Sequence, residues 1–163
     1  MIFEEVELEK KKQLYDKEDL KKLALHKISS IEANIHIYTD GSTSGNQING
    51  GAGVHIEYVD GVSEPVSLHQ ASYAAGALCS SYTGEWVALL EARKWIENNQ
   101  EHYRFLICTD SKSLHESLQS NDWKDQDPGL KEIETILKRL RVTIKILCWH
   151  ATGRSLEMIR QTI

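Results

Sequence analysis

Apolar and polar residues follow one another in patterns that predict five β-strands. Residues 105–110 begin with a continuous apolar run, which is typical of a strand buried on both faces, and residues 142–149 alternate as a strand. The other three lie close enough together to form an antiparallel meander, at residues 35–40, 53–59 and 66–71. A glycine-rich turn region is expected at 41–51, and a loop of small residues after the third strand.

Apolar residues at helical spacing predict helices between these strands. Residues 83–98 form one, with its periodic positions at Ala88, Leu89, Ala92 and Ile96. Residues 111–120 continue as a helix, and Asp127-Pro128 supplies an N-cap and a first-turn proline for another. The tail after residue 149 could begin one more. The order predicts an α/β fold: a five-stranded mixed sheet of three antiparallel N-terminal strands and two parallel strands, with helices on both faces.

The first 33 residues are strongly charged, and we interpret them as an N-terminal extension or linker. Within this segment Asp16 could cap a short helix that carries Leu20, Leu23, Ala24 and Ile31 on one side. The remaining residues, 34–163, have the length of one domain with a substantial core.

Composition narrows the class of protein. With 40% apolar and 26% charged residues the chain reads as an ordinary globular protein. It has no apolar run near the length of a membrane span, and we expect no secretory signal. Cys79, Cys108 and Cys148 are far apart, which favours a reducing, intracellular compartment, cytoplasmic or nuclear. The net charge of −5 requires any nucleic-acid footprint to be local. We expect no membrane partner, and either a monomer or part of a larger polyprotein.

Three carboxylates stand out from this pattern. Asp40 and Asp110 each end a predicted strand, where ligands bind in α/β sheets, although an Asp at such a position also commonly caps the next turn or helix. Glu85 shares the apolar stripe of its helix, and a buried carboxylate costs several kcal/mol unless something compensates it. Three carboxylates that meet must take up a proton or bind a cation. Oxygen ligands suit Mg²⁺ or Mn²⁺, and two such ions about 3.5–4 Å apart can cleave a phosphodiester.

These residues lie in three motifs that resemble those of the ribonuclease H family. The motifs are YTDGS at residues 38–42, YTGEWVAL at 82–89 and TDS at 109–111. They follow the order of the family, and the resemblance covers about residues 34–149. The form that the chain resembles most is the domain of non-LTR retrotransposon and reverse transcriptase polyproteins.

The resemblance implies a ribonuclease H-like fold and a metal-dependent endonuclease that cuts the RNA strand of an RNA–DNA hybrid. Asp40, Glu85 and Asp110 would be the catalytic residues and the ligands of two Mg²⁺ or Mn²⁺ ions. The glycine backbone at residues 50–53 would approach the minor groove and sense RNA 2′-hydroxyls. The residues expected to contact substrate are Gly41, Ser42, Gly50, Gly51, Gly53 and Ser81.

The C-terminal end departs from the family pattern. After Trp149 the family usually has His four residues on and Asp fourteen residues on, and these positions are Gly153 and Ile163. His150 is a candidate for the displaced histidine, and Glu157 for the fourth metal ligand. The loss of a ligand on the side of the attacking water is expected to weaken metal binding and slow cleavage.

Two functions therefore stay open at this point. One is an active hybrid endonuclease, and the other is a catalytically weakened domain that acts as a nucleic-acid-binding or structural module. A 3′–5′ exonuclease is disfavoured, because that group typically carries a second acid two residues after its first Asp, where this chain has Ser42.

Overall fold

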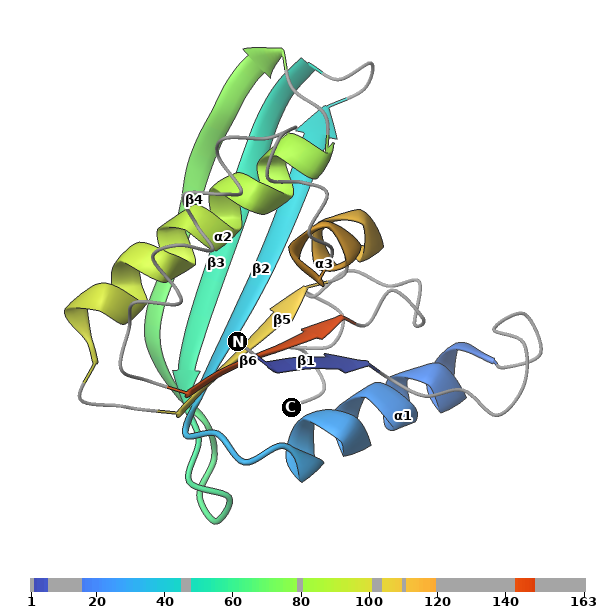
Figure 1. The fold of residues 1–163 in the computed structure, drawn as a ribbon, viewed down its shortest axis with the longest axis vertical. Helices are drawn as coiled ribbons and strands as arrows, with labels where there is room; N and C mark the ends of the chain where they lie inside the picture. Colours follow the sequence, from blue (N-terminus) through green and yellow to red (C-terminus); the bar gives the residue numbers. More distant parts are fainter. Residues whose placement is uncertain are drawn as a thin grey trace.

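The computed structural model describes residues 2–5, 16–44, 48–78, 81–100, 104–109, 111–119 and 143–148. Figure 1 shows a sheet with helices packed against it. In chain order the elements are β1 (Ile2–Glu5), α1 (Lys17–Ser30), β2 (Ile35–Ser44), β3 (Ile48–Tyr58), β4 (Val66–Leu78), α2 (Ser81–Asn98), β5 (Arg104–Thr109), α3 (Lys112–Gln119) and β6 (Thr143–Cys148).

The strands form one mixed sheet in the order β1-β6-β5-β2-β3-β4. β2, β3 and β4 pair antiparallel, whereas β5 pairs parallel with both β2 and β6. This pattern confirms the predicted arrangement of three antiparallel and two parallel strands. β1 adds a sixth strand, parallel to β6, from within the N-terminal 33 residues. The division of the chain at residue 33 stays a prediction.

Alternation along β2 separates two layers of core. Ile35 and Ile37 are fully buried in the cluster that contains residues of α2 and α3, whereas Tyr38 packs with residues of α1. Residues 105–109 of β5 are all buried, as the apolar run predicts. Helices therefore cover both faces of the sheet, which confirms the predicted architecture (Figure 1).

Both N-terminal elements are attached to the sheet by apolar side chains. The side chain of Asp16 caps α1 by accepting a hydrogen bond from the N–H of Asp19 at 2.8 Å, as predicted. Leu20, Ala24, Ile28 and Ile31 of this segment are buried. On β1, the Phe3 ring packs against the larger core cluster and lies edge-on to His115 of α3, with centroids 5.5 Å apart.

Two strands are longer than the sequence predicts. β2 continues to Ser44 and β3 begins at Ile48, so most of the expected turn at residues 41–51 is paired strand. β4 continues to Leu78 through small residues for which a loop is expected. Strand pairing uses backbone N–H and C=O groups, which glycine and alanine supply like any other residue. Register shifts between β3 and β4 accommodate the irregular pairing.

The predicted helix after Asp127-Pro128 and the predicted helix of the tail lie outside the described residues. Among the helices that the structure does describe, none combines the length and the apolar character needed to cross a bilayer.

Candidate active site

The two strands that precede the predicted aspartates lie side by side. Thr39 of β2 pairs with Thr109 of β5, and both side chains are at most 1% exposed. The Thr39 hydroxyl donates a hydrogen bond to the backbone C=O of Cys108 at 3.3 Å. This hydrogen bond ties the end of β5 to Thr39, the residue before Asp40.

The turn from β5 into α3 is fixed by two further hydrogen bonds. The N–H of Ser111 donates to the Thr109 hydroxyl at 3.1 Å, and the Ser111 hydroxyl accepts from the N–H of Leu114 at 3.2 Å. The second bond caps α3 at its N-terminus. Asp110 lies between Thr109 and Ser111 in the sequence and is outside the described residues. Its convergence with Asp40 therefore stays a prediction.

Asp40 lies within β2 and is partly exposed. Its partner across the antiparallel pair is Gly53 of β3, and residues opposed in this way share a face of the sheet. A methyl group added at Gly53 would meet no atom within 4 Å. The surface beside Asp40 is therefore open enough for another molecule to approach the backbone of β3.

Glu85 lies on the buried stripe of α2, as its helical spacing predicts. It is 5% exposed, and the apolar residues of the same stripe, Ala88, Leu89, Ala92 and Ile96, are at most 1% exposed. Its carboxylate accepts a hydrogen bond from the N–H of Gly41 at 3.0 Å. The carboxylate thus lies against the residue that follows Asp40, rather than in solvent. This contact joins α2 to β2 at the predicted site.

The donor atoms at this point are suited to a hard divalent cation. Asp40 and Glu85 both offer carboxylate oxygens, which are the ligands that Mg²⁺ and Mn²⁺ prefer. Within the described part of the chain, no group of three His, Cys, Asp or Glu residues is placed to hold a metal. A complete site therefore needs Asp110, which the sequence predicts as the third ligand. Burial raises the pKa of the nearby Cys108 thiol, so that group stays a neutral thiol.

The other predicted site residues lie on β2, β3 and α2 or outside the described residues. Gly51 lies opposite Ser42, and Gly50 is buried on the same strand. Ser81 is the first residue of α2. The side chains of Ser42 and Ser81 lie outside the described structure, and so do His150 and Glu157 as whole residues. Their predicted roles are untested.

The sequence reasoning missed the two threonines as positioning residues. Both are buried, and each uses its hydroxyl to fix the backbone beside a predicted aspartate. The signal that could have revealed them is the repeated Thr-Asp pair at the end of two apolar runs. A hydroxyl at a buried position requires a hydrogen-bond partner, and at a strand end that partner is commonly backbone.

Three solved structures that share the fold have low sequence identity to this chain. LC11-RNase H1, isolated from compost by a metagenomic approach, is 21% identical, with a TM-score of 0.58 over 80% of this chain and 90% of that one. The foamy viral protease–reverse transcriptase in complex with an RNA/DNA hybrid is 22% identical, with a TM-score of 0.58 over 80% of this chain and 18% of that one. The N-terminal RNase H domain of a Mycobacterium tuberculosis protein is 19% identical, with a TM-score of 0.55 over 70% and 85%.

At these identities the likeness establishes the fold. Comparison with curated proteins finds no match. The sequence itself matches the model of the RNase H family over residues 32–153, which is most of the chain and includes both strand ends and α2. The chain therefore belongs to the ribonuclease H family.

Proposed function

We propose that this protein is a metal-dependent endonuclease that hydrolyses the RNA strand of RNA–DNA hybrids. The observation that carries the proposal is the buried carboxylate of Glu85, held by the N–H of Gly41 beside Asp40. A buried carboxylate is costly unless a proton or a cation neutralises it, and a cation held with Asp40 would do so. Members of the family generally use divalent metal ions. A related structure, LC11-RNase H1, is a complex with an RNA/DNA hybrid, which supports this class of substrate.

Asp40, Glu85 and Asp110 would hold Mg²⁺ or Mn²⁺, most simply two ions. When bound, such ions activate water and stabilise the leaving oxygen of a phosphodiester. The N–H of Gly41 fixes the orientation of the Glu85 carboxylate by donating to Oε1. Thr39 and Thr109 hold the two strand ends side by side. We expect Asp40 and Asp110, which follow them in the sequence, to meet at this edge of the sheet.

Glycines on β3 would admit the hybrid. Gly53 lies directly across from Asp40, and Gly51 lies across from Ser42. Because the position of a side chain at Gly53 is empty, a sugar–phosphate backbone could approach the strand closely there. The minor groove of an A-form duplex is wide and shallow, so contact by backbone would read shape and 2′-hydroxyls.

We also propose the setting in which the domain works. The likeness to a foamy viral protease–reverse transcriptase, of which it covers 18%, supports an origin in a reverse transcriptase polyprotein of retrotransposon type. Cys108 and Cys148 are buried free thiols, which supports a reducing, intracellular compartment.

Cleavage of a labelled RNA–DNA hybrid tests the proposal. The intact chain should cut the RNA strand in Mg²⁺ or Mn²⁺, and Asp40→Asn and Asp110→Asn should each lower the rate by about 100-fold or more. Glu97→Gln changes an exposed carboxylate on the outer side of α2 and should leave the rate unchanged. If the intact chain cuts no faster than the two Asn variants, the domain is a hybrid-binding or structural module instead.

A further inference from the structure

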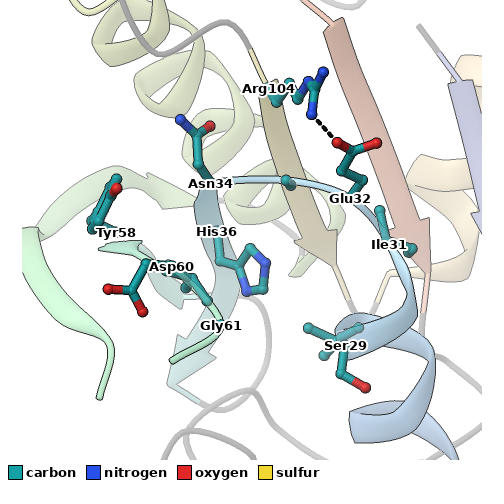
Figure 2. A pocket seen from close by; sticks show the side chains of 12 residues that line it. Ser29, Ile31, Glu32, Asn34, His36, Tyr58, Asp60, Gly61 and Arg104 are labelled. Carbon is teal, nitrogen blue, oxygen red and sulfur yellow. Dashed lines mark hydrogen bonds and ion pairs between the residues drawn. The ribbon is translucent and has the colours of Figure 1, made fainter. Parts of the chain in front are cut away.

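A second candidate site lies at the other end of β2. An open pocket of about 700 Å³ is lined by the C-terminal end of α1, the start of β2, the end of β3 with the turn that follows it, and the start of β5 (Figure 2). Its floor includes His36, which precedes Asp40 by four residues. At about 3.3 Å per residue, the two side chains are separated by roughly 13 Å along the strand. The pocket is therefore distinct from the carboxylate site.

His36 is the polar group most deeply set into this pocket. It is 6% exposed, and its ring points into the space between the Asp60–Gly61 turn and α1 (Figure 2). Its ring contacts Tyr38 edge-on at a centroid distance of 6.4 Å, and no residue in the described ranges forms a hydrogen bond with its nitrogens. Neither ring nitrogen is among the fully buried side-chain atoms of the described residues that lack a hydrogen-bond partner, so the nitrogens reach the open space of the pocket. The ring is therefore available to a bound molecule.

The imidazole of His36 is neutral at neutral pH. Burial lowers its pKa below the ordinary value of 6.5, and the negative charge of Glu57 opposes this shift only in part. A neutral imidazole keeps one nitrogen as a hydrogen-bond acceptor. A ligand that donates an N–H or O–H can therefore meet this nitrogen.

The charges around the pocket favour a cation over an anion. The guanidinium of Arg104 is paired with the carboxylate of Glu32, so these two groups largely cancel. Asp60 adds one negative charge. Asp60 is exposed and ionised at neutral pH, and the backbone N–H groups of Val62 and Ser63, which donate to its Oδ1 at 2.9 and 2.7 Å, hold its pKa below the ordinary value.

The ring of Tyr58 completes the cation-attracting surface. It is 37% exposed and lies beside Asp60 on the same side of the pocket (Figure 2). The face of an aromatic ring attracts ammonium and guanidinium groups. Ile28 and Ile31 of the α1 segment supply an apolar wall opposite this edge.

We propose that this pocket binds an organic cation, a primary ammonium or guanidinium group on a partly apolar body. One of its N–H groups would donate to the His36 nitrogen, while its positive charge is attracted by the Asp60 carboxylate and the Tyr58 ring at the edge of the pocket. The cation is either a free amine or the side chain of a lysine or arginine on another protein. The proposal does not depend on nuclease activity, because none of these residues belongs to the carboxylate site.

Titration of the full chain with three probes of matched shape tests the ligand class. The probes are benzylamine, benzyl alcohol and benzoate, followed by NMR of the backbone amides and the His36 ring. Benzylamine should give saturable shifts at His36, Tyr58 and Asp60, with a Kd at least tenfold below that of benzyl alcohol. Benzoate should not bind. The proposal is overturned if either of the other probes matches benzylamine, or if benzylamine causes no saturable shift at these residues.

Two variants test the residues. Asp60→Asn removes the charge and keeps the Oδ1 acceptor for Val62 and Ser63, so the turn is preserved and benzylamine should bind at least tenfold more weakly. Glu64→Gln removes an exposed charge from the same turn and should bind as the parent does. His36→Phe should also abolish binding; if it fails to fold, Asp60→Asn decides. Undiminished affinity in Asp60→Asn refutes the proposal.

A further arm identifies the source of the cation. A peptide with blocked ends and a single lysine is titrated against the same resonances. Tighter binding of this peptide than of benzylamine, with the same loss in Asp60→Asn, indicates a basic side chain of a protein. Weaker binding indicates a free amine.

Discussion

Replacing Glu85 by Gln distinguishes the free-energy cost of burying the carboxylate from its role as a metal ligand. The substitution keeps the shape of the side chain and an Oε1 acceptor for the N–H of Gly41. A hydrogen bond to a charged group contributes about 1.5–3 kcal/mol and one to a neutral group about 0.5–1.5, so the loss here is about 1 kcal/mol. The stability gained by removing the buried charge is larger, because burying a carboxylate costs several kcal/mol and Glu85 is 5% exposed.

In a metal chelator, the Gln variant should therefore be the more stable protein. A net gain of about 1–2 kcal/mol corresponds to a Tm higher by about 2–8 °C for a chain of this length. Divalent metal should reverse the order. At a Mg²⁺ concentration 100 times its Kd the parent gains about 2.7 kcal/mol, whereas a variant that binds 100-fold more weakly gains only about 0.4.

Thermal unfolding of both proteins in chelator and in a Mg²⁺ series measures this crossing. Glu97→Gln serves as the control on the same helix, since its carboxylate is exposed and Gln keeps an oxygen that accepts from the buried Arg93 guanidinium. It should change stability by about 0.5 kcal/mol or less and leave the response to Mg²⁺ intact. A Gln variant of Glu85 that is destabilised by more than about 1 kcal/mol in chelator would show that the carboxylate only caps Gly41. An equal gain from Mg²⁺ in both proteins would show that Glu85 is no ligand.

Three further predictions use other parts of the structure. Gly53→Ala should leave the free energy of unfolding unchanged or raise it by up to about 1 kcal/mol, because the added methyl group has open space. The same methyl group should raise KM for the hybrid. An unchanged KM in steady-state cleavage contradicts a close approach of substrate to β3. Thr109→Val should lower the free energy of unfolding in urea by about 1 kcal/mol, because it removes the acceptor of the Ser111 N–H, whereas Thr109→Ser keeps that acceptor and should keep the stability. Full stability in the Val variant contradicts the positioning role. As pH falls below 6.5, the unfolded chain takes up a proton at His36 before the folded chain does, so the free energy of unfolding should decrease, whereas above 6.5 this group has no effect. His36→Phe should flatten that dependence in urea unfolding at a series of pH values, and an unchanged slope would contradict the assignment.

The local spacing of apolar residues was sufficient to predict α2 and β5 and the residues of each that are buried. Glu85 falls on the stripe of α2 because helical spacing alone fixes which residues share a face. The apolar run of β5 predicts a strand buried on both faces for the same reason. β1 was missed, because four residues beside a charged run carry little strand signal of their own. They become a strand by pairing with β6, which is a tertiary contact.

The predicted site shows the same division. The sequence identified the strand ends and the helix face, but not the bond between Gly41 and Glu85, which are 44 residues apart. Nor could it predict the pocket around His36, which is assembled from four separate elements. The helical pattern reports which side of an element is buried, whereas the contact partners depend on how the elements pack.

The register of β2 links the core to both candidate sites. Ile37 pairs with Ile56 on one side and with Ile107 on the other, and all three residues are fully buried. Side chains alternate along a strand, so a slip of one residue would turn Ile37 away from α2 and put His36 in its place among apolar residues. The same slip would move Asp40 from its position opposite Gly53. The buried isoleucines therefore disfavour this slip, and in doing so they hold Asp40 at one end of the strand and His36 at the other.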